Sequence, residues 1–197
     1  SIADHLNNVM DTPDFRAAYN QVLPRVTDFY SGICLRPELW KRVQALRDSA
    51  EVGNLDAIRS RHVRELVKDF EECGAACDEP VRRRIREIDS ELAGVGQRFS
   101  ENVLDSTNDW ELIVDQPEVM EGFPEVLREL AREDALAKGF GDDDHPKWRF
   151  TLQAPSLVAF LKYAGDADLR REAWEASCGI GRNGNWNNSG AICRMLG

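Results

Sequence analysis

The chain has 197 residues, of which 42% are hydrophobic and 30% charged, so it can bury a core as one large or two small domains. Its net charge of −10 disfavours nucleic acid and anionic membrane surfaces as partners, because both bind basic faces. No apolar run approaches the roughly 20 residues of a membrane-spanning helix, so we expect no membrane partner.

The five cysteines indicate a reducing compartment. They are Cys34, Cys73, Cys77, Cys178 and Cys193, an odd number without a dense, short-spaced framework. The first residues also lack the basic and apolar regions of a signal peptide. We therefore expect reduced thiols and a cytoplasmic location.

The first part of the chain is predicted to form successive helices. Thr12 and Pro13 are typical of an N-cap and a first helical position. Pro37 opens a second helix that should continue to about residue 50. A third is predicted over residues 55–77, where apolar side chains recur at helical spacing through Cys73 and Cys77.

A long helix followed by an isolated strand is the most informative pattern. Its apolar positions are spaced by three or four residues, which predicts one stripe along one face: Val81, Ile85, Ile88, Leu92, Val95, Phe99 and Val103. The pattern breaks at residues 105–108, where we expect the helix to end. Residues 110–114 then have the composition of a strand.

The second part of the chain returns to helices after one more strand. A helix over residues 125–138 separates the strand at 110–114 from a second at 148–152, and the two should pair as an antiparallel ribbon. Helices are also expected from residue 154, over 166–179 and from residue 189. The predicted fold class is mainly α with one small antiparallel β-ribbon.

The predicted organisation is a single helical segment over residues 1–197. A ribbon-and-helix insertion occupies about residues 109–153. The last predicted helix carries Ile192, Met195 and Leu196 without a polar final turn, and the first residues already have helical character. Both ends are therefore expected to be cut from a longer protein.

A glycine string at residues 179–184 matches the letters GxGxxG. A dinucleotide site needs that string between a strand and a helix of a βαβ unit. Here it follows a predicted helix, and no parallel strand precedes it. We therefore interpret it as a loop.

Several side chains could in principle bind a metal ion. Cys73 and Cys77 are one helical turn apart, but zinc needs three or four ligands, so we expect two small residues on a buried stripe. Residues 142–145 lack the spacing of a calcium loop, which indicates a solvated turn. His5 and His62 have no histidine within a turn, and the third histidine lies in that acidic stretch.

A basic cluster lies on the long predicted helix, at residues 82–84 and Arg86. Acidic residues surround it, among them Glu79 and Glu87, so we expect a solvated, salt-bridged face. The chain contains no HExxH string, nucleophile elbow or P-loop. We predict no catalytic residue, no cofactor-binding residue and no metal ligand within these 197 residues.

The order of several segments resembles the M3 family of zinc oligopeptidases, the thimet oligopeptidase and oligopeptidase A group. The similar segments are residues 70–75, 88–92, 99–104, 110–115, 122–124, 148–155, 169–176, 187–188 and 192–196. The resemblance extends from about Asp4 to Gly197. It implies the N-terminal helical region of a neurolysin-like metallopeptidase.

The resemblance implies an enzyme that hydrolyses short peptides in a deep channel. Zinc would be held by an HExxH helix and a downstream Glu, which should follow Gly197, so none of these residues is assigned here. This chain would form part of the channel wall, bind no zinc and be inactive alone, and it could self-associate through apolar surface. The alternative is a stand-alone, non-catalytic helical module that binds peptides or a protein partner.

Overall fold

The computed structural model describes residues 2–10 and 12–196. These residues are mostly helical and contain one two-stranded antiparallel sheet, which confirms the predicted fold class. The chain divides into two compact units, Ser1–Gln97 and Arg98–Gly197, and each is described by itself. Within the described ranges, no helix combines the length and apolar character that crossing a membrane requires.

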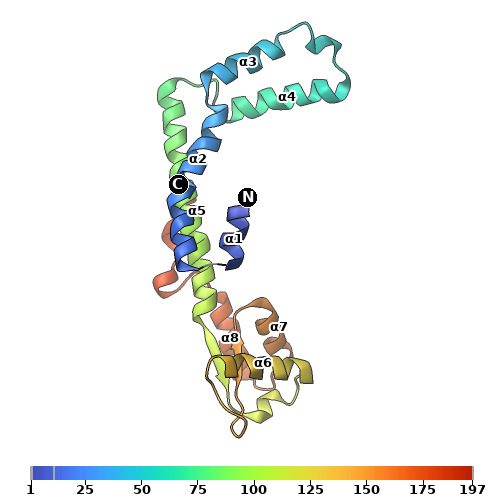
Figure 1. Cartoon of the computed structure of the whole chain (residues 1–197), viewed down its shortest axis with the longest axis vertical. Helices are drawn as coiled ribbons and strands as arrows, with labels where there is room; N and C mark the ends of the chain where they lie inside the picture. Colours follow the sequence, from blue (N-terminus) through green and yellow to red (C-terminus); the bar gives the residue numbers. More distant parts are fainter. Residues whose placement is uncertain (1, 11, 197) are drawn as a thin grey trace. The chain divides into compact units, whose positions relative to one another are not determined.

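The first unit is built from helices. It contains α1 (Ile2–Met10), α2 (Pro13–Cys34), α3 (Pro37–Arg47), α4 (Ala57–Glu72) and the beginning of α5 (Glu79–Asp109). α3 and α4 lie side by side in opposite directions (Figure 1). Their contact is centred on Trp40 and Phe70, whose rings stack with centroids 6.0 Å apart.

The predicted helix starts in this unit are confirmed. Thr12 is the N-cap of α2, and its hydroxyl accepts a hydrogen bond from the Phe15 amide at 3.4 Å. Pro13 and Pro37 occupy first-turn positions, where a missing N–H costs nothing. Asp56 caps α4 by accepting from the Arg59 amide at 2.9 Å.

The predicted end of α4 was wrong, because the helix stops at Glu72 and not at Cys77. Gly74 takes φ +90°, a left-handed conformation that lets the backbone turn back on itself. The amide of Ala75 then donates to the Phe70 carbonyl at 2.9 Å, and that of Gly74 to Glu71 at 3.0 Å. Cys73 is consequently exposed rather than part of a buried stripe.

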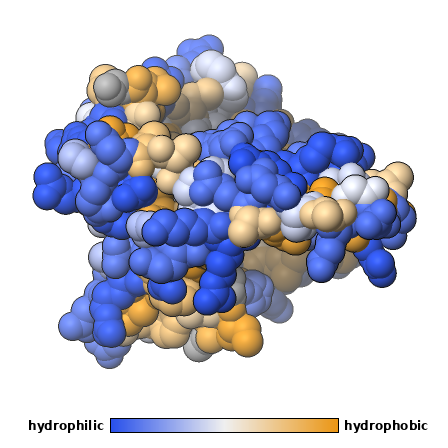
Figure 2. Space-filling model, turned by 90° about the horizontal axis from the view of Figure 1, so that it is seen from above, coloured by the Kyte–Doolittle hydropathy of each residue, from blue (hydrophilic) through white to orange (hydrophobic). Residues whose placement is uncertain are grey.

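Two long helices keep apolar side chains at the surface. All residues of α2 are described and none is buried; Val22, Val26, Phe29 and Tyr30 are exposed. On α5 the predicted stripe is buried fully only at Val95, whereas Val81, Ile88 and Leu92 are exposed. A space-filling view of the molecule shows hydrophobic residues at the surface among hydrophilic ones (Figure 2).

The second unit folds around the ribbon. Strand β1 (Glu111–Val114) pairs with β2 (Trp148–Thr151), with Glu111 opposite Thr151 and Val114 opposite Trp148, as predicted. Figure 1 shows α6 (Glu125–Ala137) crossing this ribbon. The remaining elements are α7 (Ala154–Tyr163), α8 (Ala167–Cys178) and α9 (Ser189–Leu196), with short 3-10 helices η2 (Pro117–Met120) and η3 (Gly184–Trp186).

Aromatic side chains make the core of this unit. Phe160 is completely buried, and its ring lies 4.6 Å from that of Phe150 between centroids. Phe123 packs against both, and Trp148 and Val114 join the same cluster. Burial of such rings gives the ribbon and its helices a hydrophobic core of their own.

The predicted end of the long helix was also wrong. α5 continues through residues 105–108 to Asp109, although these residue types favour caps and turns over helix interiors. The Thr107 hydroxyl donates to the Val103 carbonyl at 2.7 Å, and Ser106 accepts from the Gly181 amide at 3.1 Å. These bonds satisfy side chains that would otherwise compete with the helix.

Candidate functional site

The second unit contains a polar pocket of about 410 Å³ beside the end of α5. Backbone and side chains of α5, α8 and η3 line it together with Leu152. Its polar and aromatic lining residues are Ser106, Asp109, Trp110, Asn183, Asn185 and Trp186. The pocket therefore combines an open cavity with groups that can both donate and accept hydrogen bonds.

A buried amide holds the loop that forms one side of this pocket. Asn188 is only 2% exposed, and its side-chain oxygen accepts from the Asn102 amide at 2.8 Å. Its Nδ2 donates to the Phe99 carbonyl at 3.2 Å. Its backbone amide donates to the Gly181 carbonyl at 2.8 Å. Asn188 thus ties the loop to α5 of the same unit through every polar group of its side chain.

The loop needs glycine where it meets α5. Gly181 takes φ +66°, and a Cβ there would lie 3.0 Å from Nδ2 of Asn188 and 3.4 Å from Cγ2 of Val103. Gly179 follows α8, and a Cβ on it would lie 2.7 Å from Nδ2 of Asn183. A side chain at position 181 would strain the backbone and crowd the buried Asn188, so the close approach of the loop depends on Gly181. At position 179 the φ of −86° is ordinary, and the exposed Asn183 side chain can move away.

The chemistry of the pocket is that of binding. Asn183 and Asn185 are exposed and present amide groups that match the donor and acceptor pattern of a peptide backbone. Trp110 and Trp186 are half-buried and offer apolar faces. Asp109 is the single charged lining residue and favours a cationic group. No histidine or cysteine lines the pocket.

The glycine string at residues 179–184 is a loop, as predicted. Gly179 is the C-cap of α8, and the chain then turns into η3. The element directly before the string is the helix α8 and not a strand, so the string lacks the setting of a dinucleotide site. The sequence pattern did not predict that this segment lines a pocket. The one signal that could have indicated it is Trp186, a large aromatic residue among asparagines.

The candidate metal ligands do not assemble into a site. Cys73 lies in the turn after α4, and the carboxylate of Asp142 accepts from the amides of Asp144 and His145 at 2.9 and 2.7 Å. These backbone hydrogen bonds, the one from His145 first, lower the pKa of Asp142. Among the described residues no group of three or more His, Cys, Asp or Glu side chains could hold a metal ion.

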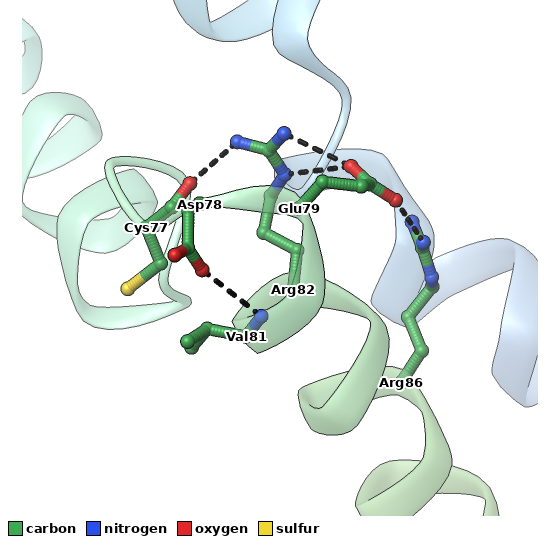
Figure 3. A network of polar contacts seen from close by, with 6 residues as sticks. All are labelled: Cys77, Asp78, Glu79, Val81, Arg82 and Arg86. Carbon is green, nitrogen blue, oxygen red and sulfur yellow. Dashed lines mark hydrogen bonds and ion pairs between the residues drawn. The ribbon is translucent and has the colours of Figure 1, made fainter.

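The basic cluster is salt-bridged, as predicted, and Figure 3 shows its arrangement at the start of α5. Glu79 bonds Arg82 at 2.9 Å and Arg86 at 3.0 Å. Hydrogen bonds from Arg82 and then Arg86 lower the pKa of Glu79. Arg82 also donates to the Cys77 carbonyl at 2.6 Å, and Asp78 accepts from the Val81 amide at 3.1 Å. The cluster stabilises a helix start.

Comparison with known proteins shows which sequences this chain resembles. Residues 1–83 match the sequence model of the neurolysin/thimet oligopeptidase N-terminal domain. The chain is 30% identical to oligopeptidase A of Haemophilus influenzae and to that of Escherichia coli, in each case over 100% of this chain and 29% of the relative. It is also 30% identical to the probable cytosolic oligopeptidase A of Arabidopsis thaliana, over 98% of this chain and 28% of the relative.

A mainly helical region is thus similar to peptidases along its whole length. Residues 1–83 match an N-terminal domain of the M3 oligopeptidases, and the whole chain is similar to oligopeptidase A, a resemblance that its sequence pattern predicted. The chain spans less than a third of the length of the relatives named above.

Proposed function

We propose that this chain is the N-terminal scaffold of a zinc-dependent oligopeptidase that hydrolyses short peptides in the cytoplasm. The observation that carries the proposal is the match to oligopeptidase A along the whole chain, at 30% identity. The chain would form one wall of the channel that admits substrate. In this proposal other residues of the protein supply the zinc ligands and the hydrolytic step; among the described residues, no group of three or more His, Cys, Asp or Glu side chains could hold a metal ion.

The polar pocket is the part of this wall that we assign to peptide contact. Asn183 and Asn185 can pair with the backbone of a peptide of any sequence. Trp110 and Trp186 can cover an apolar side chain, and the carboxylate of Asp109 favours an amino terminus or a basic side chain. The ligand class is therefore a short peptide carrying a positive charge.

Calorimetric titration of the chain with short synthetic peptides tests this assignment. Replacing Trp186 by Ala should weaken binding about tenfold, since one buried aromatic contact is worth roughly 1.4 kcal/mol or more. Trp174→Ala is the matched control, because Trp174 is 56% exposed and does not line the pocket. Equal effects of the two substitutions, or no binding at all, would reject the peptide site.

The catalytic part of the proposal has a separate test. The 197-residue chain alone should cleave no fluorogenic peptide and hold no stoichiometric zinc. A longer polypeptide that includes the residues after Gly197 should cleave the peptide, lose activity with a chelator and regain it with zinc. Chelator-sensitive cleavage by the chain alone would overturn the scaffold assignment, and an inactive longer polypeptide would overturn the peptidase.

The alternative function, a stand-alone binding module, is favoured by one surface of the first unit. An apolar pocket of about 250 Å³ lies between α1 and α2 and includes Phe15, Val22 and Val26. Exposed apolar surface of this kind also favours self-association of the chain. Light scattering distinguishes self-association from a stand-alone binding module. Association of the chain that is lost in a Val22→Ser, Val26→Ser variant supports self-association through this surface. A chain that is monomeric and binds peptides supports the stand-alone module.

A further inference from the structure

Two cysteines of the first unit are brought together by the packing of α2 against the end of α4. Cys34 is the last residue of α2 and packs against the cluster that contains Phe70 and Ala75. Cys73 lies between those two residues, as the C-cap of α4. The two neighbouring thiols therefore lie at the two ends of the segment that contains α3 and α4.

The next residue after each cysteine gives an independent measure of this proximity. A Cβ built on Gly74 would lie 3.9 Å from Cδ2 of Leu35, a side chain that is 1% exposed. The residues that follow the two cysteines therefore lie close together, and Cys73 is a neighbour of Cys34.

The two thiols differ in accessibility. Cys73 is exposed, whereas Cys34 is half-buried and donates a weak hydrogen bond of 3.6 Å to the Ser31 carbonyl. Burial, and then the neighbouring Cys73, raises the pKa of Cys34 to about 12. Cys73 is therefore the thiol that an external reagent reaches first.

We propose that Cys34 and Cys73 are a redox-responsive pair, which a low-molecular-weight disulfide such as glutathione disulfide converts into an intramolecular disulfide. The pair is defined by the contact of α2 with the turn after α4, and it is independent of the peptide site. It assigns a modification site to the first unit.

The chemistry proceeds by two exchanges. The Cys73 thiolate attacks one sulfur of glutathione disulfide, whose S–S bond breaks, and one glutathione leaves as thiolate and takes up a proton. Cys34 then loses its proton and attacks the Cys73 sulfur of the mixed disulfide, which releases the second glutathione. Two protein thiols are oxidised, one glutathione disulfide is reduced to two thiols, and two protons pass from protein to glutathione.

The new bond would close a loop around the whole α3–α4 pair. A crosslink of this kind restricts the unfolded chain and so stabilises the fold. The melting temperature of the first unit should rise by about 5 °C or more on oxidation. Reduction with dithiothreitol should reverse the shift.

Mass spectrometry after oxidation tests the pairing directly. When labelled after unfolding in denaturant, the reduced chain should bind N-ethylmaleimide at all five cysteines. The chain oxidised by glutathione disulfide should bind it at three and yield a crosslinked peptide containing Cys34 and Cys73. Cys73→Ser should abolish the crosslink. Cys77→Ser is the matched control, because Cys77 lies in the same turn and should leave the crosslink intact.

Three outcomes would overturn the proposal. They are a bond between Cys73 and Cys77, a mixed disulfide on Cys73 that Cys34 never resolves, and crosslinks between chains whose yield grows with protein concentration. If Cys34→Ser fails to fold, Cys34→Ala serves as the second variant. It should stop at the mixed disulfide with glutathione attached to Cys73.

Discussion

The two units of this chain are stabilised in different ways. The second unit buries a cluster of aromatic rings, with Phe160 fully enclosed, around a ribbon that no other described strand joins. In the first unit α2 runs for 22 residues with no buried side chain, and the small core lies between α3 and α4. The stability of the first unit therefore depends more on helix caps and turns. Its α2 helix also leaves apolar side chains exposed, which another polypeptide could contact.

The largest expected effect is the loss of a ring from the second unit. Phe160→Ala should lower the free energy of unfolding by about 3–5 kcal/mol, because a cavity remains where a fully buried ring was. Phe29→Ala on α2 is the matched control and should cost less than about 1 kcal/mol, since Phe29 is 54% exposed. Urea denaturation measures both. Comparable losses would remove the contrast between the units.

Next in size is the loss of the amide that holds the pocket loop. Asn188→Ala should cost about 2 kcal/mol, because it leaves the Phe99 carbonyl and the Asn102 amide without this partner. Hydrogen exchange of the Gly181 amide should rise as the loop loosens. Asn185→Ala is the control, since that side chain is exposed. Unchanged exchange at Gly181 in Asn188→Ala would contradict the tie between loop and helix.

A turn in the first unit should be sensitive to a single methyl group. Gly74→Ala should destabilise by about 1–3 kcal/mol, because its φ of +90° disfavours a side chain and its Cβ would lie 2.5 Å from Cδ1 of Ile85. Gly32→Ala has open space in the helical interior of α2 and should stabilise by about 0.5–1 kcal/mol. Thermal melts of the two variants should shift in opposite directions. If both melting temperatures shift in the same direction, the left-handed turn at Gly74 does not determine the stability of this unit.

The cap of α5 should contribute less. Asp78→Ala removes the acceptor for the Val81 amide and should cost about 1 kcal/mol in thermal or urea melts. Asp78→Asn keeps a capping oxygen and should retain most of that stability. If Asn and Ala at this position prove equally destabilising, the side chain does not act as a cap.

The smallest effect is a dependence on pH at the start of α5. The pKa of Glu79 lies below its ordinary value of 4.5, so its stabilisation is fully present above pH about 4.5 and is lost as pH falls through the lowered pKa. Melts of Glu79→Gln and the unsubstituted chain should therefore differ at pH 7, and the difference should shrink as the pH is lowered below 4.5 through the lowered pKa. A difference that does not change with pH would show that the ion pairs with Arg82 and Arg86 are not its source.

Local signals predicted those features that depend on nearby residues. Thr12 and Pro13 mark the start of α2 because the cap bond joins residues three apart. The two strands and their pairing followed from alternating character on either side of one helix. The family resemblance also followed from the order of several such segments.

The sequence by itself thus determined the helix starts, the ribbon and the kinship of this protein. The helix starts depend on contacts within a few residues, and the ribbon and the kinship were predicted from the order of segments along the chain. Only the tertiary structure decided where α4 and α5 end and which side chains form the pocket. α5 extends to Asp109 because Ser106 accepts a bond from Gly181, which lies far along the chain. Contacts of this kind depend on how distant segments pack, and no local pattern encodes them.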